Sequence, residues 1–295
     1  MRVAVTGATG FIGSALLPTL TAAGHDPVAL PREFYAPVML GADAVIHLAG
    51  LAHRSGRKAP LPGAFEVANA ELPLAVQEAA RAAGVPQMIQ VSTIAVLGGN
   101  AGPLREDSPL APTTPYDRAK AKAETALLAA GAAPALTILR PPLVYGPGAK
   151  GNLAALLRLC RTPLPLPFGA VRNRRSMVGL GNLVSALLFL LDHPGQGIVH
   201  VTDNRDLSLP EIVTAIRAGF GRPPNLLSLP PDLIRAALSA TGRVRMADQL
   251  LGDQIVEMEK LPALGWSPPN SPEVDLHRMA EAYAATAAAD FRGSP

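Results

Sequence analysis

An apolar stretch that begins at the third residue runs directly into a glycine-rich segment, and this arrangement constrains the fold more than any other part of the chain. The stretch is Val3–Val5, and the segment Thr6–Gly13 reads TGATGFIG, with its glycines spaced three and three. We predict a buried strand, a tight turn and a helix that opens near Gly10. Glycines let a backbone approach a pyrophosphate, and the N–H groups of a helix start bind anions. The alternative is a turn without a ligand, because a single glycine-rich turn is weak support for a binding site.

Short apolar stretches alternate with helical patterns through the first half of the chain. The expected strands are 3–5, 28–30, 44–48, 88–92 and 136–140, and the expected helices are 11–23, 64–83 and 116–130. Such alternation favours βαβ units and a parallel sheet that helices cover on both faces. We therefore predict an α/β fold, a Rossmann-type doubly wound parallel sheet with a smaller, irregular C-terminal substrate domain. The segment Pro31–Ala42 is too short for both a helix and a further strand, so we expect that part of the sheet to be abbreviated.

Composition excludes several classes of protein. The formal net charge is +3 over 295 residues, and the basic runs Arg54–Lys58 and Arg172–Arg175 are short, which is unlike a nucleic-acid-binding protein. Cys160 is the only cysteine, and the six histidines show no ligand spacing on one helix face, so we expect no disulfide and no metal site. The most apolar long stretch, Met177–Leu191, is interrupted by two glycines, Asn182 and Ser185 and is shorter than a membrane span. We also expect no signal peptide before the first strand, and hence a cytoplasmic protein without membrane insertion.

A tyrosine and a lysine lie four residues apart at Tyr116 and Lys120, a spacing that puts both on one side of a helix. The pKa of a tyrosine is about 10, and lowering it by about three units needs about 4 kcal/mol, which nearby cations in a partly dry site can supply. Ser92 and Thr93 end a predicted central strand, where side chains line the ligand crevice of a parallel sheet. Each feature alone also has a structural explanation, as a helix surface or as a strand-end cap.

Taken in order along the chain, these motifs resemble those of extended short-chain dehydrogenases/reductases, in the nucleotide-sugar epimerase/dehydratase group. TGATGFIG matches the group's glycine motif, and VIHLAG at 45–50 is similar to its strand beside the cofactor. VSTIAVLG at 91–98 is similar to its catalytic strand, and Tyr116 with Lys120 matches its YxxxK pair. LRPPLVYGPG at 139–148 and LGWSP at 264–268 are similar to later segments, so the resemblance covers nearly the whole chain.

The resemblance implies roles for particular residues. Tyr116 would be the general acid/base, Lys120 would tune its pKa and bind ribose, and Thr93 would be the catalytic hydroxyl. The implied cofactor ligands are Gly7, Gly10, Phe11, Ile12, Gly13, Arg32, Leu48, Ala49, Gly50, Tyr116, Lys120 and Pro141. The implied substrate ligands are Ser92, Thr93, Asn152 and Arg175, with Asn69 on a helix near the site. Residues 1–146 would form the NAD(P)-binding domain, with a returning segment near 176–202, and residues 147–295 most of the substrate-binding domain.

The sequence departs from the group's pattern after the second strand. Members that prefer NAD usually carry an acidic residue there, whereas this chain has Pro31 and Arg32. An arginine at this point accommodates a 2′-phosphate, so the sequence favours NADP, with NAD as the alternative. Leu97 replaces a common tyrosine, and together with the segments PYDRAK at 115–120 and GNL at 151–153 this makes the chain resemble reductases of UDP-4-keto-6-deoxy-HexNAc sugars more than the UDP-glucose epimerases.

Several functions stay open on these grounds. The leading hypothesis is an NAD(P)-dependent 4-keto-sugar reductase acting on a UDP-sugar, and a UDP-sugar 4-epimerase would use the same residues. A 4,6-dehydratase is disfavoured because Ile94 and Ala95 stand where those enzymes usually have Asp-Glu. A non-catalytic cofactor sensor and a reductase of a non-sugar carbonyl are the remaining alternatives. A homodimer through the helices at 64–83 and 116–130 is a further expectation.

Overall fold

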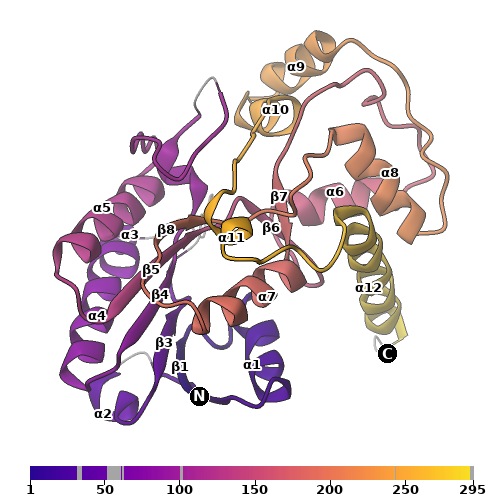
Figure 1. Cartoon of the computed structure of the whole chain (residues 1–295). Helices are drawn as coiled ribbons and strands as arrows, with labels where there is room; N and C mark the ends of the chain where they lie inside the picture. Colours follow the sequence, from indigo (N-terminus) through magenta and orange to yellow (C-terminus); the bar gives the residue numbers. More distant parts are fainter. Residues whose placement is uncertain (32–34, 52–60, 62, 100–101, 243, 293–295) are drawn as a thin grey trace. The chain divides into compact units, whose positions relative to one another are not determined.

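The computed structural model describes residues 1–31, 35–51, 61, 63–99, 102–242 and 244–292. Among these residues the main sheet has six strands in the order β2-β1-β3-β4-β5-β8 (Figure 1). The strands are β1 (Arg2–Thr6), β2 (Asp26–Ala29), β3 (Ala44–His47), β4 (Gln87–Val91), β5 (Ala135–Arg140) and β8 (Gly197–His200). Every neighbouring pair is parallel, which confirms the predicted doubly wound α/β fold. The strand order reverses between β1 and β3, so the ligand crevice is expected outside their carboxyl ends.

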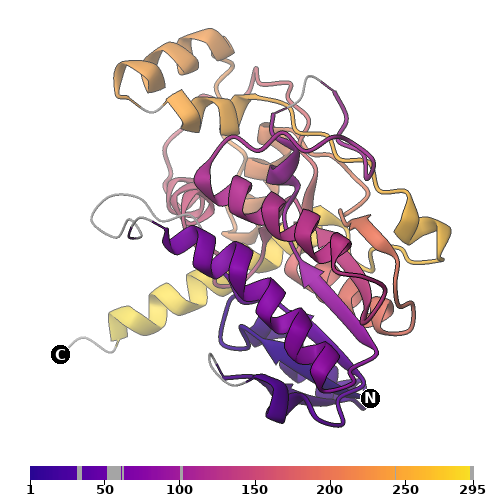
Figure 2. The same cartoon turned by 90° about the vertical axis from the view of Figure 1, so that its left-hand side faces the viewer.

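Helices cover both faces of this sheet (Figures 1 and 2). One face carries α2 (Tyr35–Met39), α4 (Leu72–Ala82) and α5 (Pro115–Ala129), and the other carries α1 (Gly13–Ala22) and α7 (Leu180–Leu191). The short helices are α3 (Ala64–Glu66), a π-helical turn (Val67–Glu71), a 3-10 helix (Ile94–Leu97) and α11 (Lys260–Ala263). A buried cluster fills the first face, in which Met39, Val76 and Leu127 of the helices pack with Val45 and Met88 of the strands. Burying each such side chain contributes about 1.5–3 kcal/mol.

The structure corrects two predicted helices. The first helix begins at Gly13 rather than near Gly10, so the glycine turn is longer than expected. The predicted helix 64–83 is three segments, because a π-helical turn at Val67–Glu71 separates α3 from α4. The segment between β2 and β3 holds the short helix α2 and no strand in its described residues, as the abbreviated sheet required.

The rest of the chain adds a small parallel pair of strands, β6 (Leu143–Tyr145) and β7 (Met177–Gly179). Its helices are α6 (Asn152–Cys160), α8 (Leu209–Gly219), α9 (Pro231–Ala240), α10 (Val244–Leu251) and α12 (Pro272–Arg292). A second buried cluster joins them, with Tyr145, Leu157, Phe168, Ile216 and Met279 among its members.

By internal packing the chain forms two compact units. Unit 1 comprises Met1–Pro142, Leu183–Val201 and Glu257–Ser267. Unit 2 comprises Leu143–Asn182, Thr202–Val256 and Pro268–Pro295. The chain therefore leaves unit 1 after β5 and returns to it twice.

Candidate active site

The glycine turn after β1 packs against the backbone that follows β3. Gly7 has φ +68°, and a β-carbon there would lie 2.8 Å from the backbone nitrogen of Ala49. Gly13 packs onto the Gly7 carbonyl so closely that a β-carbon would overlap it, and Gly10 N–H donates to that carbonyl at 2.9 Å. Among the described residues, no side chain caps the start of α1. A tight backbone cradle with an open helix start fits the pyrophosphate of a dinucleotide.

Thr6 joins the glycine turn to the end of β3. Its hydroxyl oxygen accepts from the N–H groups of Leu48 and Ala49 at 3.2 and 3.1 Å. The hydroxyl proton therefore points to His47 Nδ1, which lies 2.6 Å away. Burial first, and Lys120 second, lower the pKa of His47 to about 3, so its imidazole is neutral. Neither Thr6 nor His47 was among the predicted site residues.

Lys120 lies at the carboxyl ends of two strands. Its side chain is buried, and Nζ donates to the Val91 carbonyl at the end of β4 at 3.1 Å. A β-carbon on Gly50 would lie 3.5 Å from this Nζ and 2.7 Å from Asn69 Oδ1. Asn69, in the π-helical turn, bonds both the N–H and the carbonyl of Leu51 at 3.0 Å. The structure thus brings the predicted residues Gly50, Asn69 and Lys120 together.

Tyr116 lies in the first turn of α5, one turn before Lys120. Thr114 and Asp117 form a capping box that fixes this helix start, and the Tyr116 ring meets Phe65 edge to face at 6.1 Å. Burial first, and Asp117 second, raise the pKa of Tyr116 to about 12. The lowered pKa expected from the sequence depends on a bound cationic nicotinamide as well as on the lysine, and in the protein alone burial dominates. Burial also lowers the pKa of Lys120 to about 8, an effect that Glu124 opposes.

The two predicted hydroxyls at the end of β4 have different surroundings. Thr93 is half-buried and caps the 3-10 helix, where its Oγ1 accepts from Ala95 N–H at 3.2 Å. This contact uses an oxygen lone pair, whereas a substrate oxygen would take the O–H proton. Ser92 is buried, and its Oγ lacks a hydrogen-bond partner among the described residues. Pro141 follows β5, and its carbonyl accepts from Ile94 N–H at 3.1 Å.

The remaining predicted ligands lie apart from this set in the chain. Asn152 and Arg175 belong to unit 2, where Asn152 Nδ2 donates to Gln249 at 2.6 Å. The Arg175 guanidinium donates to the Gly252 carbonyl at 3.1 Å and to Gln254 at 3.0 Å, and burial lowers its pKa. Asn152 is therefore held by α10 itself, and Arg175 by the residues that directly follow α10. Arg32 lies outside the described residues.

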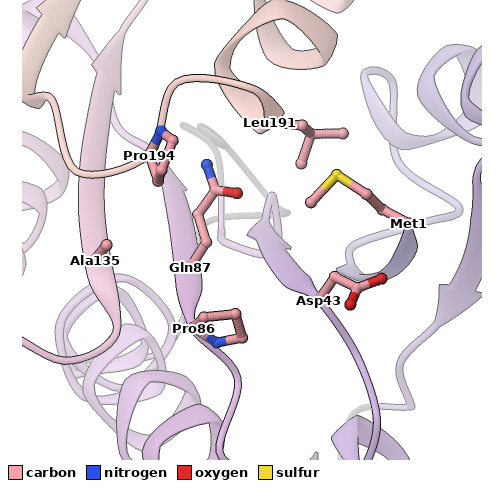
Figure 3. A pocket seen from close by; sticks show the side chains of 7 residues that line it. All are labelled: Met1, Asp43, Pro86, Gln87, Ala135, Leu191 and Pro194. Atoms are coloured by element: carbon pink, nitrogen blue, oxygen red, sulfur yellow. The ribbon is translucent and has the colours of Figure 1, made fainter.

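A cavity of about 480 Å³ opens in unit 1 at the opposite end of the strands, where they begin (Figure 3). It is lined by residues at or before the amino ends of the strands, namely Met1, Asp43, Pro86, Gln87, Ala135, Leu191 and Pro194. Ligands of doubly wound sheets bind outside the carboxyl ends, so this cavity is distinct from the candidate active site. Within the described ranges, the side chains form no group of three or more histidine, cysteine, aspartate or glutamate residues placed to hold a metal. None of the described helices combines the length and the apolar character that crossing a bilayer requires.

A parallel sheet with a glycine cradle and a Tyr-Lys pair defines a dinucleotide-dependent enzyme of the short-chain dehydrogenase type. The chain belongs to the NAD dependent epimerase/dehydratase family, whose model matches residues 3–202. It is 29% identical over 312 residues to a UDP-glucose 4-epimerase of Vibrio cholerae, covering 95% of each chain. It is 29% identical over 298 residues to a ceramide reductase of Caulobacter vibrioides, covering 92% of this chain and 87% of that one. A solved structure of a human epimerase family protein with NADPH, SDR39U1, superposes with a TM-score of 0.76 at 24% identity. The match covers 95% of this chain and 99% of that one.

Proposed function

We propose that the chain transfers hydride between NAD(P) and C4 of a UDP-sugar, as a reductase of a 4-keto sugar. The observation that carries the proposal is the position of Lys120 at the ends of β3 and β4, one helical turn from Tyr116 and beside the glycine turn of β1. This position supports an acid/base role for Tyr116 beside a cation, since doubly wound sheets bind dinucleotides outside the carboxyl ends of their strands.

The residues of each unit take separate parts in the proposed reaction. In unit 1 the glycine turn binds the cofactor, which supplies the hydride when bound. Tyr116 gives a proton to the sugar oxygen, Lys120 favours the resulting phenolate, and Thr93 donates a hydrogen bond to the same oxygen. In unit 2 Asn152 and Arg175 bind the nucleotide diphosphate, for which a planar guanidinium is well suited.

Tyr116→Phe tests whether this set is catalytic. General acid/base catalysis contributes about 10²–10⁴-fold, so the variant is expected to lose at least about 100-fold in kcat. Tyr283→Phe is the matched control, because Tyr283 also meets a phenylalanine edge to face, Phe220, at 6.3 Å and the same 73°. Full activity of Tyr116→Phe would instead contradict catalysis by Tyr116, Lys120 and Thr93.

NADP is the cofactor that we favour, since Arg32 follows the second strand where an acidic residue would select NAD. Arg32→Ala is expected to raise KM for NADPH and to leave KM for NADH nearly unchanged. A fall in KM for NADPH would contradict this preference.

A UDP-sugar 4-epimerase is the second candidate, which the similarity to the Vibrio cholerae enzyme favours. Turnover distinguishes the two, because a reductase consumes one reduced nicotinamide per sugar, whereas an epimerase regenerates its cofactor in each cycle. Steady nicotinamide absorbance during complete sugar conversion would identify an epimerase.

A third candidate is a reductase of a non-sugar ketone, for which the similarity to a ceramide reductase is the argument. Such an enzyme has no need of the diphosphate ligands Asn152 and Arg175. Calorimetric titration with UDP is therefore the discriminating measurement. Binding that weakens in Arg175→Met supports the nucleotide-sugar substrate, and absence of UDP binding supports the non-sugar ketone.

A further inference from the structure

The active-site face of α5 continues for one turn beyond the lysine. Tyr116, Lys120 and Glu124 follow one another at four-residue intervals, so their side chains lie in one row along the helix. Both Lys120 and Glu124 are buried, with 6% and 1% of their surface exposed. A buried carboxylate in this row is a countercharge for the lysine.

Arg140 at the end of β5 holds this carboxylate with its planar fork. Arg140 Nε lies 3.2 and 3.1 Å from the two oxygens of Glu124, and Nη2 lies 2.6 Å from Oε2. Each side chain of the pair is only 2% exposed. The ion pair therefore fixes α5 to the strand next to β4, and it competes with Lys120 for the charge of Glu124.

His200 lies beside Arg140 on the neighbouring strand. It is the register partner of Arg140 on β8, and its Nδ1 lies 3.0 Å from the Glu257 carbonyl. A carbonyl only accepts, so Nδ1 carries the proton and Nε2 is an acceptor. His200 Nε2 and Arg140 Nη1 are both buried without a hydrogen-bond partner among the described residues. Burial first, and the charge of Arg140 as well, lower the pKa of His200, while the Glu257 and Leu104 carbonyls raise it. Glu124 occupies Nε and Nη2 of Arg140, which leaves Nη1 as a donor whose hydrogen bond a neutral imidazole nitrogen can accept.

Ionisable groups on α5 and on the neighbouring strands surround Lys120. His47 on β3 is neutral, Tyr116 and Glu124 lie on α5, and Arg140 faces Glu124. Burial disfavours the charged form of Lys120, and Glu124 favours it. With one carboxylate for two buried cations, the charge of Lys120 depends on how strongly Arg140 engages Glu124.

We propose that Glu124 and Arg140 are positioning residues that together set the fraction of Lys120 that is charged near neutral pH. The proposal rests on the proposed function, in which the charged Lys120 binds the cofactor ribose and assists Tyr116. Glu124 maintains the charge, and Arg140 limits it.

The test follows NADPH affinity from pH 6 to 10 by nicotinamide fluorescence, with the pH profile of kcat/KM as a second readout. Glu124→Gln is expected to move the alkaline loss of affinity to lower pH by about one unit, because it removes the only carboxylate of the row. Arg140→Met is expected to move it to higher pH, because Glu124 is then left with Lys120 alone. Loss of a structural contact alone would not shift the pH of affinity loss in opposite directions in the two variants.

Controls keep the outcome interpretable. Arg217→Met removes another buried arginine, in unit 2, whose hydrogen bonds within the described ranges all go to backbone carbonyls, and it should leave the pH dependence unchanged. If Glu124→Gln does not fold, the double variant Glu124→Gln/Arg140→Met removes both charges and is expected to move the loss of affinity to lower pH. Buried ion pairs are often replaced by uncharged groups at little cost.

Lys120→Met separates the proposed function from the positioning role of Glu124 and Arg140. Its NADPH affinity should be weaker than that of the wild type and independent of pH between 6 and 10. A pH dependence that persists in Lys120→Met contradicts the role of Lys120 in the proposed function. A pH dependence that Lys120→Met abolishes, but that Glu124→Gln and Arg140→Met leave unmoved or shift in one direction, overturns the positioning role alone.

Discussion

Gly50 is the residue at which the smallest change should disturb the active site. A β-carbon there would lie 2.7 Å from Asn69 Oδ1, so Gly50→Ala must displace the Asn69 amide, while Lys120 Nζ at 3.5 Å would be in ordinary contact with the new methyl group. We expect a loss of about 10-fold or more in kcat/KM, measured by steady-state kinetics, because a shift of about 1 Å in a catalytic group can cost 10²-fold. Gly99→Ala is the control, since a β-carbon at Gly99 meets open space. Equal kinetics in the two variants would contradict a role for the Gly50 contact.

Single residues could be predicted from the sequence where a short, regular spacing linked them. Residues that meet only because distant segments pair in the fold could not be predicted. Tyr116 and Lys120 stand four apart, and a helix brings such residues to one side. Thr6 and His47 are 41 residues apart, and only the pairing of β1 with β3 brings them to 2.6 Å. No spacing along the chain signals that bond.

The start of α5 is the element on which the proposed chemistry depends most. Thr114 caps this helix by accepting from Asp117 N–H at 3.2 Å, and Tyr116 lies in the turn that the cap fixes. Thr114→Ala is expected to cost about 1 kcal/mol of unfolding free energy and also to lower kcat. Ser208→Ala removes the matching capping box of α8 and is expected to cost similar stability with little loss of kcat. Chemical denaturation and steady-state kinetics of both variants measure the difference, and equal kcat values would contradict the link between cap and catalysis.

Regular elements of unit 1 could be predicted because their apolar patterns are long enough to recognise. The π-helical turn at Val67–Glu71 could not be predicted. Its residues continue the pattern of a helix, and the change in backbone hydrogen bonding does not alter that pattern. The strands β6 and β7 have three residues each, too few for a period to be visible. Asn69 shows the consequence, since the π-helical turn carries the side chain that bonds Leu51.

Over the whole molecule, two buried neutral histidines make the stability of unit 1 depend on pH. Burial lowers the pKa of His47 to about 3 and that of His200 to about 4, against about 6.5 in an unfolded chain. Below pH 6.5 the unfolded chain binds protons that the folded chain does not, so unfolding becomes more favourable as the pH falls. The slope is at most about 1.4 kcal/mol per pH unit for each histidine, or about 4 kcal/mol for both between pH 6.5 and 5.

Carboxylates with raised pKa values act in the opposite direction, because the folded chain then binds their protons first. Glu106 is such a group in unit 1, and Asp203 and Asp275 are in unit 2, with burial as the main cause in each. On acidification from pH 7, unit 1 should therefore lose stability before unit 2. Trp266 is the only tryptophan, is 5% exposed and belongs to unit 1, so its fluorescence reports the unfolding of that unit.

Urea unfolding followed by Trp266 fluorescence at pH 5 to 8 measures the pH dependence directly. His200→Gln removes one titrating group and is expected to reduce the slope by about half below pH 6.5, because His47 alone then remains. His277→Gln alters an exposed histidine on α12 in unit 2 and should leave the slope unchanged. Identical slopes in the wild-type and His200→Gln proteins between pH 7 and 5 would show that His200 takes up a proton in the folded chain as readily as in the unfolded one, since Glu106 is common to both. In that case the His200 imidazole would not be the neutral hydrogen-bonding group on which the geometry around Arg140 depends.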